Sequence, residues 1–283
     1  MQYVKPRDEA ELLAHLQRDG ATIVSGATDV LVKMRRGMRP PEVIVDIADL
    51  RELHGVSKSV GRVVVGAATT EEALLNDTTI RLHFPLLTRV LASLASPQVR
   101  SRGTLGGNVA NASPAADSAI PLLVYEASAC LVGAEGRREL PMDEFFLGPG
   151  RTALAKGEFI RSFALPIPQV PWSIFYHKVG QRQGLAISVA SLGMLIRCSH
   201  GVVQEVRLAV GSVAPTPMRL RVVEGLLTNR RLSDSLAAEA GELAASTVCP
   251  ISDIRATAAY RRQVIGDLLR QFLASASGPC AGL

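Results

Sequence analysis

The order of the predicted helices and strands indicates an α+β protein of two domains. Its first part reads helix, strand, helix, strand, strand, helix, helix, which is not the regular alternation of a doubly wound sheet. A cluster of prolines at Pro166, Pro168 and Pro171 then precedes three strand-like runs and two or three helices. A chain of 283 residues is long enough for two domains. We therefore expect one domain over residues 1–168 and a second over residues 172–283.

The first predicted domain alternates short strands with capped helices. Capping-box sequences begin helices at Asp8 and Thr69, where a side-chain oxygen can accept a hydrogen bond from an N–H of the first turn. Apolar residues at helical spacing predict another helix over residues 85–96. Short apolar or β-branched runs bounded by turn residues predict strands at residues 22–24, 42–46, 62–66, 129–133, 138–140 and 159–165.

The second predicted domain begins with strands and ends in helices. Strand-like runs occupy residues 174–179, 187–197 and 203–210. In the last helix, apolar residues recur every four positions, which predicts one buried face made by Tyr260, Val264, Leu268 and Phe272.

Composition excludes several classes of function. No apolar run approaches the roughly 20 residues that cross a bilayer, and the N-terminus lacks the apolar centre of a secretion signal, so we expect a cytoplasmic protein. The net charge of +5 comes from dispersed basic pairs, and aromatic residues make up only 4%, which argues against nucleic-acid binding. Cys130, Cys198, Cys249 and Cys280 are far apart, so we expect neither a disulfide framework nor a metal or iron–sulfur site on this chain.

One stretch, from Thr104 to Asp117, concentrates small and hydrogen-bonding residues. The adjacent Gly106 and Gly107 let the backbone approach a flat or anionic group, because neither carries a Cβ atom. Short polar groups of Thr104, Asn108, Asn111 and Ser113 can point at the same ligand. The same residues are also typical of an ordinary turn and loop, and that alternative stays open.

The carboxylate that ends this stretch has two possible roles. Asp117 can accept hydrogen bonds from a diol, such as that of a ribose. It can equally be the N-cap of a helix that begins at Ser118, and both roles are compatible.

An upstream stretch predicts an anion site. A short strand ends in Ser-Gly, and a helical pattern begins near Thr28, with Val30, Leu31 and Met34 on one side. The unpaired N–H groups and positive dipole end of such a helix attract anions. The alternative is a plain strand–helix connection with Thr28 as its cap. The stretch reads Ile23-Val24-Ser25-Gly26-Ala27-Thr28-Asp29-Val30.

Together these stretches resemble the Ala-Gly-Gly-Thr-Asp and Thr-Ile-Gly-Gly-Asn motifs of one family. It is the FAD-binding medium subunit of molybdenum hydroxylases, of the xanthine dehydrogenase and carbon monoxide dehydrogenase type. Further landmarks of that family follow in the same order along the chain: Phe146-Leu-Gly-Pro-Gly-Arg-Thr, Tyr176-His-Lys-Val-Gly-Gln-Arg, Val213-Ala-Pro-Thr-Pro and Asp253-Ile-Arg.

The resemblance implies a fold and a set of FAD-binding residues. It implies a two-lobed FAD-binding domain of the vanillyl-alcohol-oxidase/PCMH type, divided near residue 55, and a C-terminal domain with an antiparallel sheet and a small helical bundle. It also assigns cofactor contacts to Ile23, Val24, Ser25, Gly26, Ala27, Thr28, Asp29, Val30, Thr104, Gly106, Gly107, Asn108, Ser113, Asp117, Ile160 and Lys178.

Three of these assignments compete with simpler roles. Lys178 matches a lysine near the flavin, but it can also be an exposed lysine at a strand end. Ile160 can pack on the cofactor or simply fill the core. Ala27 stands where the family has a second glycine. Because other residues are tolerated there, we expect a negative φ at Ala27; a positive φ would cost about 1 kcal/mol.

The resemblance implies electron transfer and no catalytic side chain on this chain. Iron–sulfur clusters of a partner subunit would supply electrons to FAD, a molybdenum-cofactor subunit would oxidise the substrate, and NAD or another acceptor would receive the electrons. The alternatives are a self-sufficient, non-covalent flavoprotein oxidoreductase and an assembly subunit that has lost its flavin. None of His15, His54 and His83 lies at the upstream stretch, so we expect no covalent flavin. Neither the oxidised substrate nor the acceptor can be read from the chain.

Overall fold

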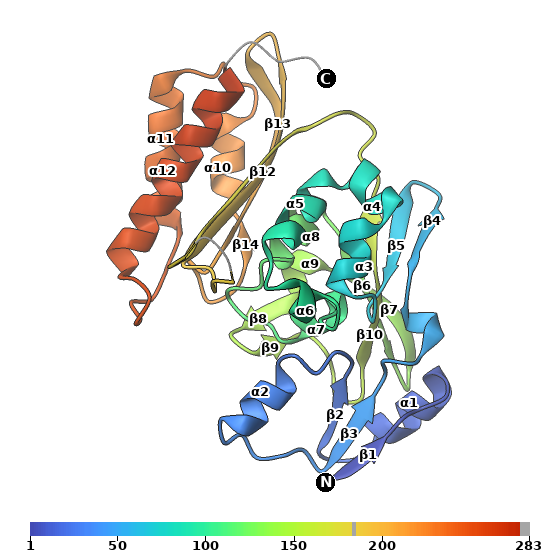
Figure 1. The fold of residues 1–283 in the computed structure, drawn as a ribbon. Coiled ribbons are helices and arrows are strands. Elements are labelled where there is room, and N and C mark those ends of the chain that lie inside the picture. Colours follow the sequence, from blue (N-terminus) through green and yellow to red (C-terminus); the bar gives the residue numbers. More distant parts are fainter. Residues whose placement is uncertain (183–184, 278–283) are drawn as a thin grey trace. The chain divides into compact units, whose positions relative to one another are not determined.

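The computed structural model describes residues 1–182 and 185–277, which form two compact units. Each unit gathers more than one segment of the chain (Figure 1). The first unit consists of Met1–Phe84, Leu94–Ser113 and Glu126–Ile167. The second consists of Pro85–Ser93, Pro114–Tyr125 and the segment from Pro168 onward.

The first unit contains two principal sheets and a small hairpin. A parallel sheet has the order β1-β3-β2, and an antiparallel sheet has the order β4-β5-β10-β6-β7. The strands of the parallel sheet are β1 (Gln2–Val4), β2 (Ala21–Val24) and β3 (Val43–Asp46). Those of the antiparallel sheet are β4 (Val56–Ser59), β5 (Arg62–Gly66), β6 (Ser128–Gly133), β7 (Gly136–Pro141) and β10 (Phe159–Pro166). The hairpin pairs β8 (Phe146–Gly148) with β9 (Arg151–Thr152).

Short helices surround these sheets. Asp8 caps the first of them as predicted and accepts a hydrogen bond from the Glu11 N–H at 2.8 Å. The helix that follows β5 is capped by Thr70, one residue after the predicted Thr69, whose hydroxyl bonds to Gly55 instead. The helices of the first unit are α1 (Glu9–Leu16), α2 (Val30–Arg35), the 3₁₀ helix η1 (Arg51–Leu53), α3 (Glu71–Asn76), α4 (Thr78–His83), α6 (Pro97–Arg100), α7 (Leu105–Ala110) and α9 (Met142–Phe145).

A hydrophobic cluster anchors the parallel sheet. Leu12 and Leu16 of α1 pack with Val43 and Val45 of β3, and all four side chains are buried. Phe159 at the start of β10 belongs to the same cluster, so the core joins the two sheets of the first unit. Burial of such side chains contributes roughly 1.5–3 kcal/mol each.

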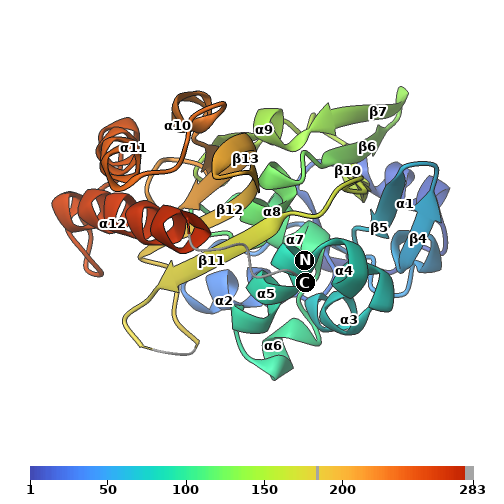
Figure 2. The same ribbon diagram turned by 90° about the horizontal axis from the view of Figure 1, so that it is seen from above.

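The second unit contains one antiparallel sheet with helices on both faces. The strand order is β11-β12-β13-β14, and the strands are β11 (Ser173–Val179), β12 (Ala190–Ser199), β13 (Val202–Gly211) and β14 (Met218–Arg219). Helices α10 (Arg221–Leu227), α11 (Asp234–Thr247) and α12 (Ala258–Ser277) cover one face (Figure 2). Their apolar residues form one core with Leu192, Met194 and Ile196 of β12.

Two helices that precede this sheet in the sequence pack on its other face. They are α5 (Pro85–Ser93) and α8 (Ala119–Val124). A Cβ atom on Gly193 would lie 2.4 Å from Cγ2 of Ile120, so glycine in β12 makes room for α8. Segments from within the first predicted domain therefore complete the core of the second unit.

The predicted α+β class is confirmed, and most predicted strands lie within a few residues of the observed ones. The strand predicted over residues 187–197 begins three residues too early, because β12 starts at Ala190. The buried face predicted for α12 is wrong at Tyr260, which is 47% exposed, whereas Leu268 and Phe272 are buried. Cys280 lies outside the described residues. In the described part of the chain, no helix has the length and apolar character to span a membrane.

We propose that residues 166–171 link the two units. Limited proteolysis should cut first at residues 169–171, which are exposed and outside regular secondary structure. Because α5 and α8 pack on the second sheet, the two fragments should stay together in gel filtration under native conditions and separate in denaturant. Cuts confined to residues 187–210, or fragments that separate without denaturant, would contradict this division.

Candidate functional site

The upstream motif forms a turn at the end of β2. Val24 is buried at the end of the strand, and residues 25–29 leave the sheet before α2 begins at Val30. The predicted helix start near Thr28 is therefore wrong by two residues, and Thr28 is not its cap. Asp29 occupies the N-cap position and makes no side-chain capping bond. None of the residues of α2 is fully buried, and only Val30 and Met34 are half-buried.

Gly26 places this turn directly against the second motif. A Cβ atom on Gly26 would lie 1.7 Å from the carbonyl oxygen of Arg102 and 3.0 Å from the nitrogen of Gly103. Real Cβ atoms do not approach that closely, so this contact requires glycine. Two stretches far apart in the sequence therefore meet within the first unit.

Backbone hydrogen bonds fix the second motif in position. The N–H of Leu105 donates to the Thr69 carbonyl at 3.1 Å, and that of Gly106 donates to the Ala67 carbonyl at 2.8 Å. The Gly103 carbonyl accepts from the N–H of Glu71 at 2.9 Å. The motif is therefore bonded to the loop between β5 and α3.

The two adjacent glycines have different surroundings. A Cβ on Gly106 would lie 2.6 Å from the Ala67 carbonyl oxygen, so this glycine permits close packing within the protein. A Cβ on Gly107 would meet only Oγ1 of Thr104, at 3.0 Å, and Gly107 is exposed. Thr104 also accepts a hydrogen bond from the Gly107 N–H at 3.1 Å. Of the pair, Gly107 is the one whose surface is open to a ligand.

Ala27 adopts the left-handed conformation, with φ of 56°. The expectation of a negative φ at this position is therefore wrong. A left-handed residue within a turn lets successive N–H groups point into one concavity, which is a known way to bind anions. In the described part of the chain, no acceptor pairs with the N–H groups of Gly26, Ala27 and Thr28. These groups fit a phosphate-bearing ligand, because an anion would satisfy them.

A lysine that the sequence did not single out connects the two motifs. Lys33 Nζ lies 2.6 Å from a carboxylate oxygen of Asp29 and donates to Oδ1 of Asn111 at 2.6 Å. The four-residue spacing from Asp29 on a helix was the only available signal. The contact with Asn111 depends on the tertiary fold and could not be seen in the sequence.

The other predicted residues of the first unit take mixed positions. Ile23 packs against the core of the parallel sheet, and Ile160 in β10 is buried, 6% exposed. Val24, Ile23 and Ile160 therefore take packing positions in the structure. Asn108 and Ser113 are half-buried beside the second motif.

Asp117 and Lys178 belong to the second unit, where they form a buried ion pair. Lys178 Nζ lies 2.7 Å from Oδ2 of Asp117 and also donates to the Ser93 carbonyl at 3.2 Å. The side chain of Asp117 is only 8% exposed and that of Lys178 only 10%, so Lys178 is not an exposed lysine at a strand end. Helix α8 begins at Ala119 with Ser118 as its N-cap residue, so the capping role considered for Asp117 is wrong.

Burial dominates the electrostatics of this pair. Loss of solvation raises the pKa of Asp117, and the charge of Lys178 opposes that rise only partly. Tyr176 lies beside the pair, and burial together with the negative charge of Asp117 raises the pKa of its hydroxyl well above the ordinary value. Within the described residues, Oδ1 of Asp117 and the Tyr176 hydroxyl have no hydrogen-bond partner of good geometry.

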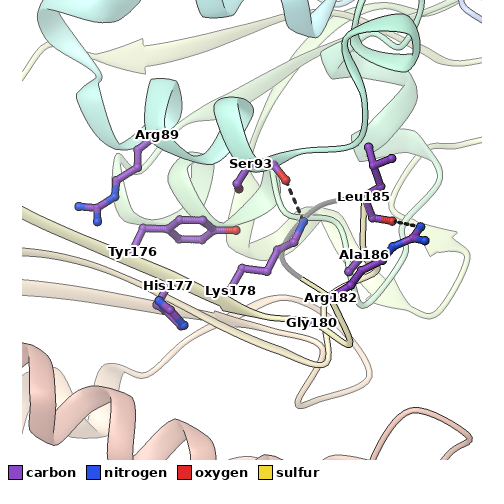
Figure 3. Close-up of a pocket in the computed structure, with 9 residues that line it drawn as sticks. All are labelled: Arg89, Ser93, Tyr176, His177, Lys178, Gly180, Arg182, Leu185 and Ala186. Carbon is purple, nitrogen blue, oxygen red and sulfur yellow. Dashed lines mark hydrogen bonds between the residues drawn. The ribbon is translucent and has the colours of Figure 1, made fainter.

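A cavity of about 230 Å³ opens beside Tyr176 and Lys178 in the second unit. Figure 3 shows the polar ends of both side chains directed toward Ser93 of α5. Arg89 and Arg182 also line this cavity, so three of its side chains carry positive charge. The cavity is suited to an anionic or strongly polar group. No cluster of three or more possible metal ligands occurs in residues 1–182 and 185–277.

The turn, with its N–H groups that lack acceptors in the described part of the chain, would suit a phosphate-bearing organic cofactor. Residues 1–168 match the family model of the FAD binding domain in molybdopterin dehydrogenase, and residues 175–276 match that of the CO dehydrogenase flavoprotein C-terminal domain. The first model alone covers more than half of the chain.

Relatives of known name cover nearly the full chain. The xanthine dehydrogenase FAD-binding subunit of Escherichia coli O157:H7 is 31% identical over 93% of this chain and 90% of its own. The carbon monoxide dehydrogenase medium chain of Hydrogenophaga pseudoflava is 30% identical over 99% and 98%. A solved carbon monoxide dehydrogenase from Hydrogenophaga pseudoflava, which lacks the Mo-pyranopterin moiety, matches with a TM-score of 0.94 over 98% of both chains at 30% identity.

The chain belongs to the molybdenum hydroxylase family as its FAD-binding subunit, of the xanthine and carbon monoxide dehydrogenase medium-chain type. It is an oxidoreductase subunit, and its cofactor is FAD.

The close approach at Gly26 can be tested by paired substitutions in neighbouring residues. Gly26→Ala should lower the free energy of unfolding by about 2–3 kcal/mol, because the new Cβ would collide with the Arg102 carbonyl. Ala27→Gly should raise it by about 1 kcal/mol, because glycine tolerates the positive φ. Chemical denaturation measures both values. Equal stabilities for the two variants would show that the turn is built differently.

The buried pair in the second unit can be tested by a double-mutant cycle. Asp117→Ala should lower the free energy of unfolding by about 3 kcal/mol, because it leaves the Lys178 ammonium buried without its counter-ion. The double variant with Lys178→Met should recover most of that loss. If Asp117→Ala costs only about 1 kcal/mol, and costs the same whether position 178 is Lys or Met, Asp117 would be a capping residue instead.

Proposed function

We propose that this chain is the FAD-carrying electron-transfer subunit of a molybdenum-containing hydroxylase or dehydrogenase. It would accept electrons from iron–sulfur clusters of a partner subunit and pass them to NAD or another acceptor, while a molybdenum-cofactor subunit oxidises the substrate. Bound FAD supplies the redox chemistry, since it can take up one or two electrons. The substrate would therefore be recognised on another polypeptide, and the related chains are indeed named for different substrates, xanthine and carbon monoxide.

The observation that carries this proposal is the turn held against Arg102 by Gly26. We assign the pyrophosphate of FAD to the free N–H groups of Gly26, Ala27 and Thr28, where an anion would satisfy groups that otherwise lack acceptors. The exposed backbone at Gly107 offers a second surface to the dinucleotide. We also propose that the remaining predicted residues, from Ile23 to Val30 and from Thr104 to Ser113, contribute to FAD binding in the first unit.

In the second unit we assign Lys178 to the redox-active end of the cofactor. A cation beside a flavin ring stabilises negative charge on the reduced ring. One charge at 4 Å contributes ~4 kcal/mol at an effective dielectric of 20. Asp117 would hold the ammonium in place through the 2.7 Å ion pair, so we assign it a positioning role. We also propose that Asp117 accepts hydrogen bonds from hydroxyl groups of the cofactor.

The absorption spectrum and metal content of the chain purified alone test this function. We expect about one FAD per chain, released by acid because no histidine lies at the turn, and no stoichiometric iron, because the cysteines are dispersed. Co-expression with its partner subunits should add the spectrum of iron–sulfur clusters. Iron bound to the isolated chain would indicate a self-sufficient redox protein, and a chain that binds no flavin would indicate an assembly subunit.

A further inference from the structure

The segment that follows the cofactor turn exposes apolar side chains that a folded protein normally buries. Leu31 and Val32 of α2 are 48% and 42% exposed, and Met38 just beyond the helix is 39% exposed. Figure 1 shows α2 leaving the parallel sheet directly after β2. Isolated exposed apolar residues are common, but three within eight positions form a patch typical of an interaction site.

The same segment carries an excess of positive charge. From Val30 to Pro41 the sequence contains Lys33, Arg35, Arg36 and Arg39 and no acidic residue. Asp29 pairs with Lys33, but in the described part of the chain no carboxylate forms an ion pair with the three arginines. A patch with an apolar centre and unpaired arginines is complementary to a protein surface of opposite charge.

Local energetics also favour a partner at this place. An isolated helix shorter than roughly 12 residues is unstable in water, and most helices gain their stability by burying an apolar face. Helix α2 has six residues, of which Val30 and Met34 are half-buried and the other four are exposed. Contact with another protein would supply the burial that this unit does not provide.

We propose that Leu31, Val32, Arg35, Arg36, Met38 and Arg39, here called the α2 surface, form the docking surface for the iron–sulfur partner through an acidic face of that subunit. This rests on the proposed function. Of the proposed partners, the iron–sulfur subunit is the one that would hand electrons directly to this chain. Because α2 continues directly from the turn assigned to the FAD pyrophosphate, a subunit docked here would contact the first unit beside its proposed cofactor-binding residues.

The test uses the full chain, affinity-tagged and co-expressed with the iron–sulfur and molybdenum subunits. The charge-reversed variant Arg35→Glu/Arg36→Glu/Arg39→Glu and the apolar variant Leu31→Ser/Met38→Ser are compared with the wild type. We expect roughly tenfold less iron per chain after purification at moderate salt in the charge-reversed variant, because like charges then face each other. FAD per chain and the melting temperature of the isolated variants should stay as in the wild type.

A control variant reverses two exposed positive charges elsewhere in the first unit. Lys58 in β4 and Arg81 in α4 are exposed and far from α2 in the sequence, and Lys58→Glu/Arg81→Glu should retain the full iron content. Normal iron in the charge-reversed variant, or loss of iron together with FAD, would overturn the assignment. So would charge-dependent binding of the wild-type chain to phosphatidylserine vesicles with unchanged assembly. A wild-type chain that brings down no iron would instead contradict the proposed function itself.

Discussion

The close approach of Gly26 to the Arg102 carbonyl is the contact on which the candidate site depends. It brings a strand-end turn and a glycine-rich helix start together within the first unit. The second motif cannot yield, because its own N–H groups are bonded to the carbonyls of Ala67 and Thr69. The turn is therefore fixed against the second motif, while the N–H groups of Gly26, Ala27 and Thr28 lack acceptors in the described part of the chain. A rigid set of donors costs little reorganisation when an anion binds.

The second unit holds a different kind of group. Lys178 and Asp117 are buried together beside an open cavity, and the pair is held by β11 and by the chain just before α8. A buried pair of this kind adds little net stability, because desolvation offsets the attraction. Its value lies in holding a cation at one position. This explains why Asp117, which the sequence suggested as a helix cap or a diol acceptor, has its carboxylate directed at a lysine.

The sequence predicted the α+β class and most strands, because short apolar runs and proline clusters report local structure directly. It also predicted cofactor contacts at Gly26 and Gly107, which stay predictions. It could not assign Gly106 to packing against Ala67 or Lys33 to Asn111, because both contacts join residues far apart in the chain. The prediction of a negative φ at Ala27 was wrong for a related reason. Tertiary contacts hold the turn there, and they override the preference of a single alanine.

Amide hydrogen exchange across the turn tests the central claim most directly. The N–H groups of Gly26, Ala27 and Thr28 lack acceptors within the described structure, so they should exchange rapidly in the FAD-free chain. Saturating FAD should slow their exchange strongly, while the buried strand β3 changes little. If these three amides exchange equally fast with and without FAD, while FAD protects amides elsewhere, then the phosphates bind at another place.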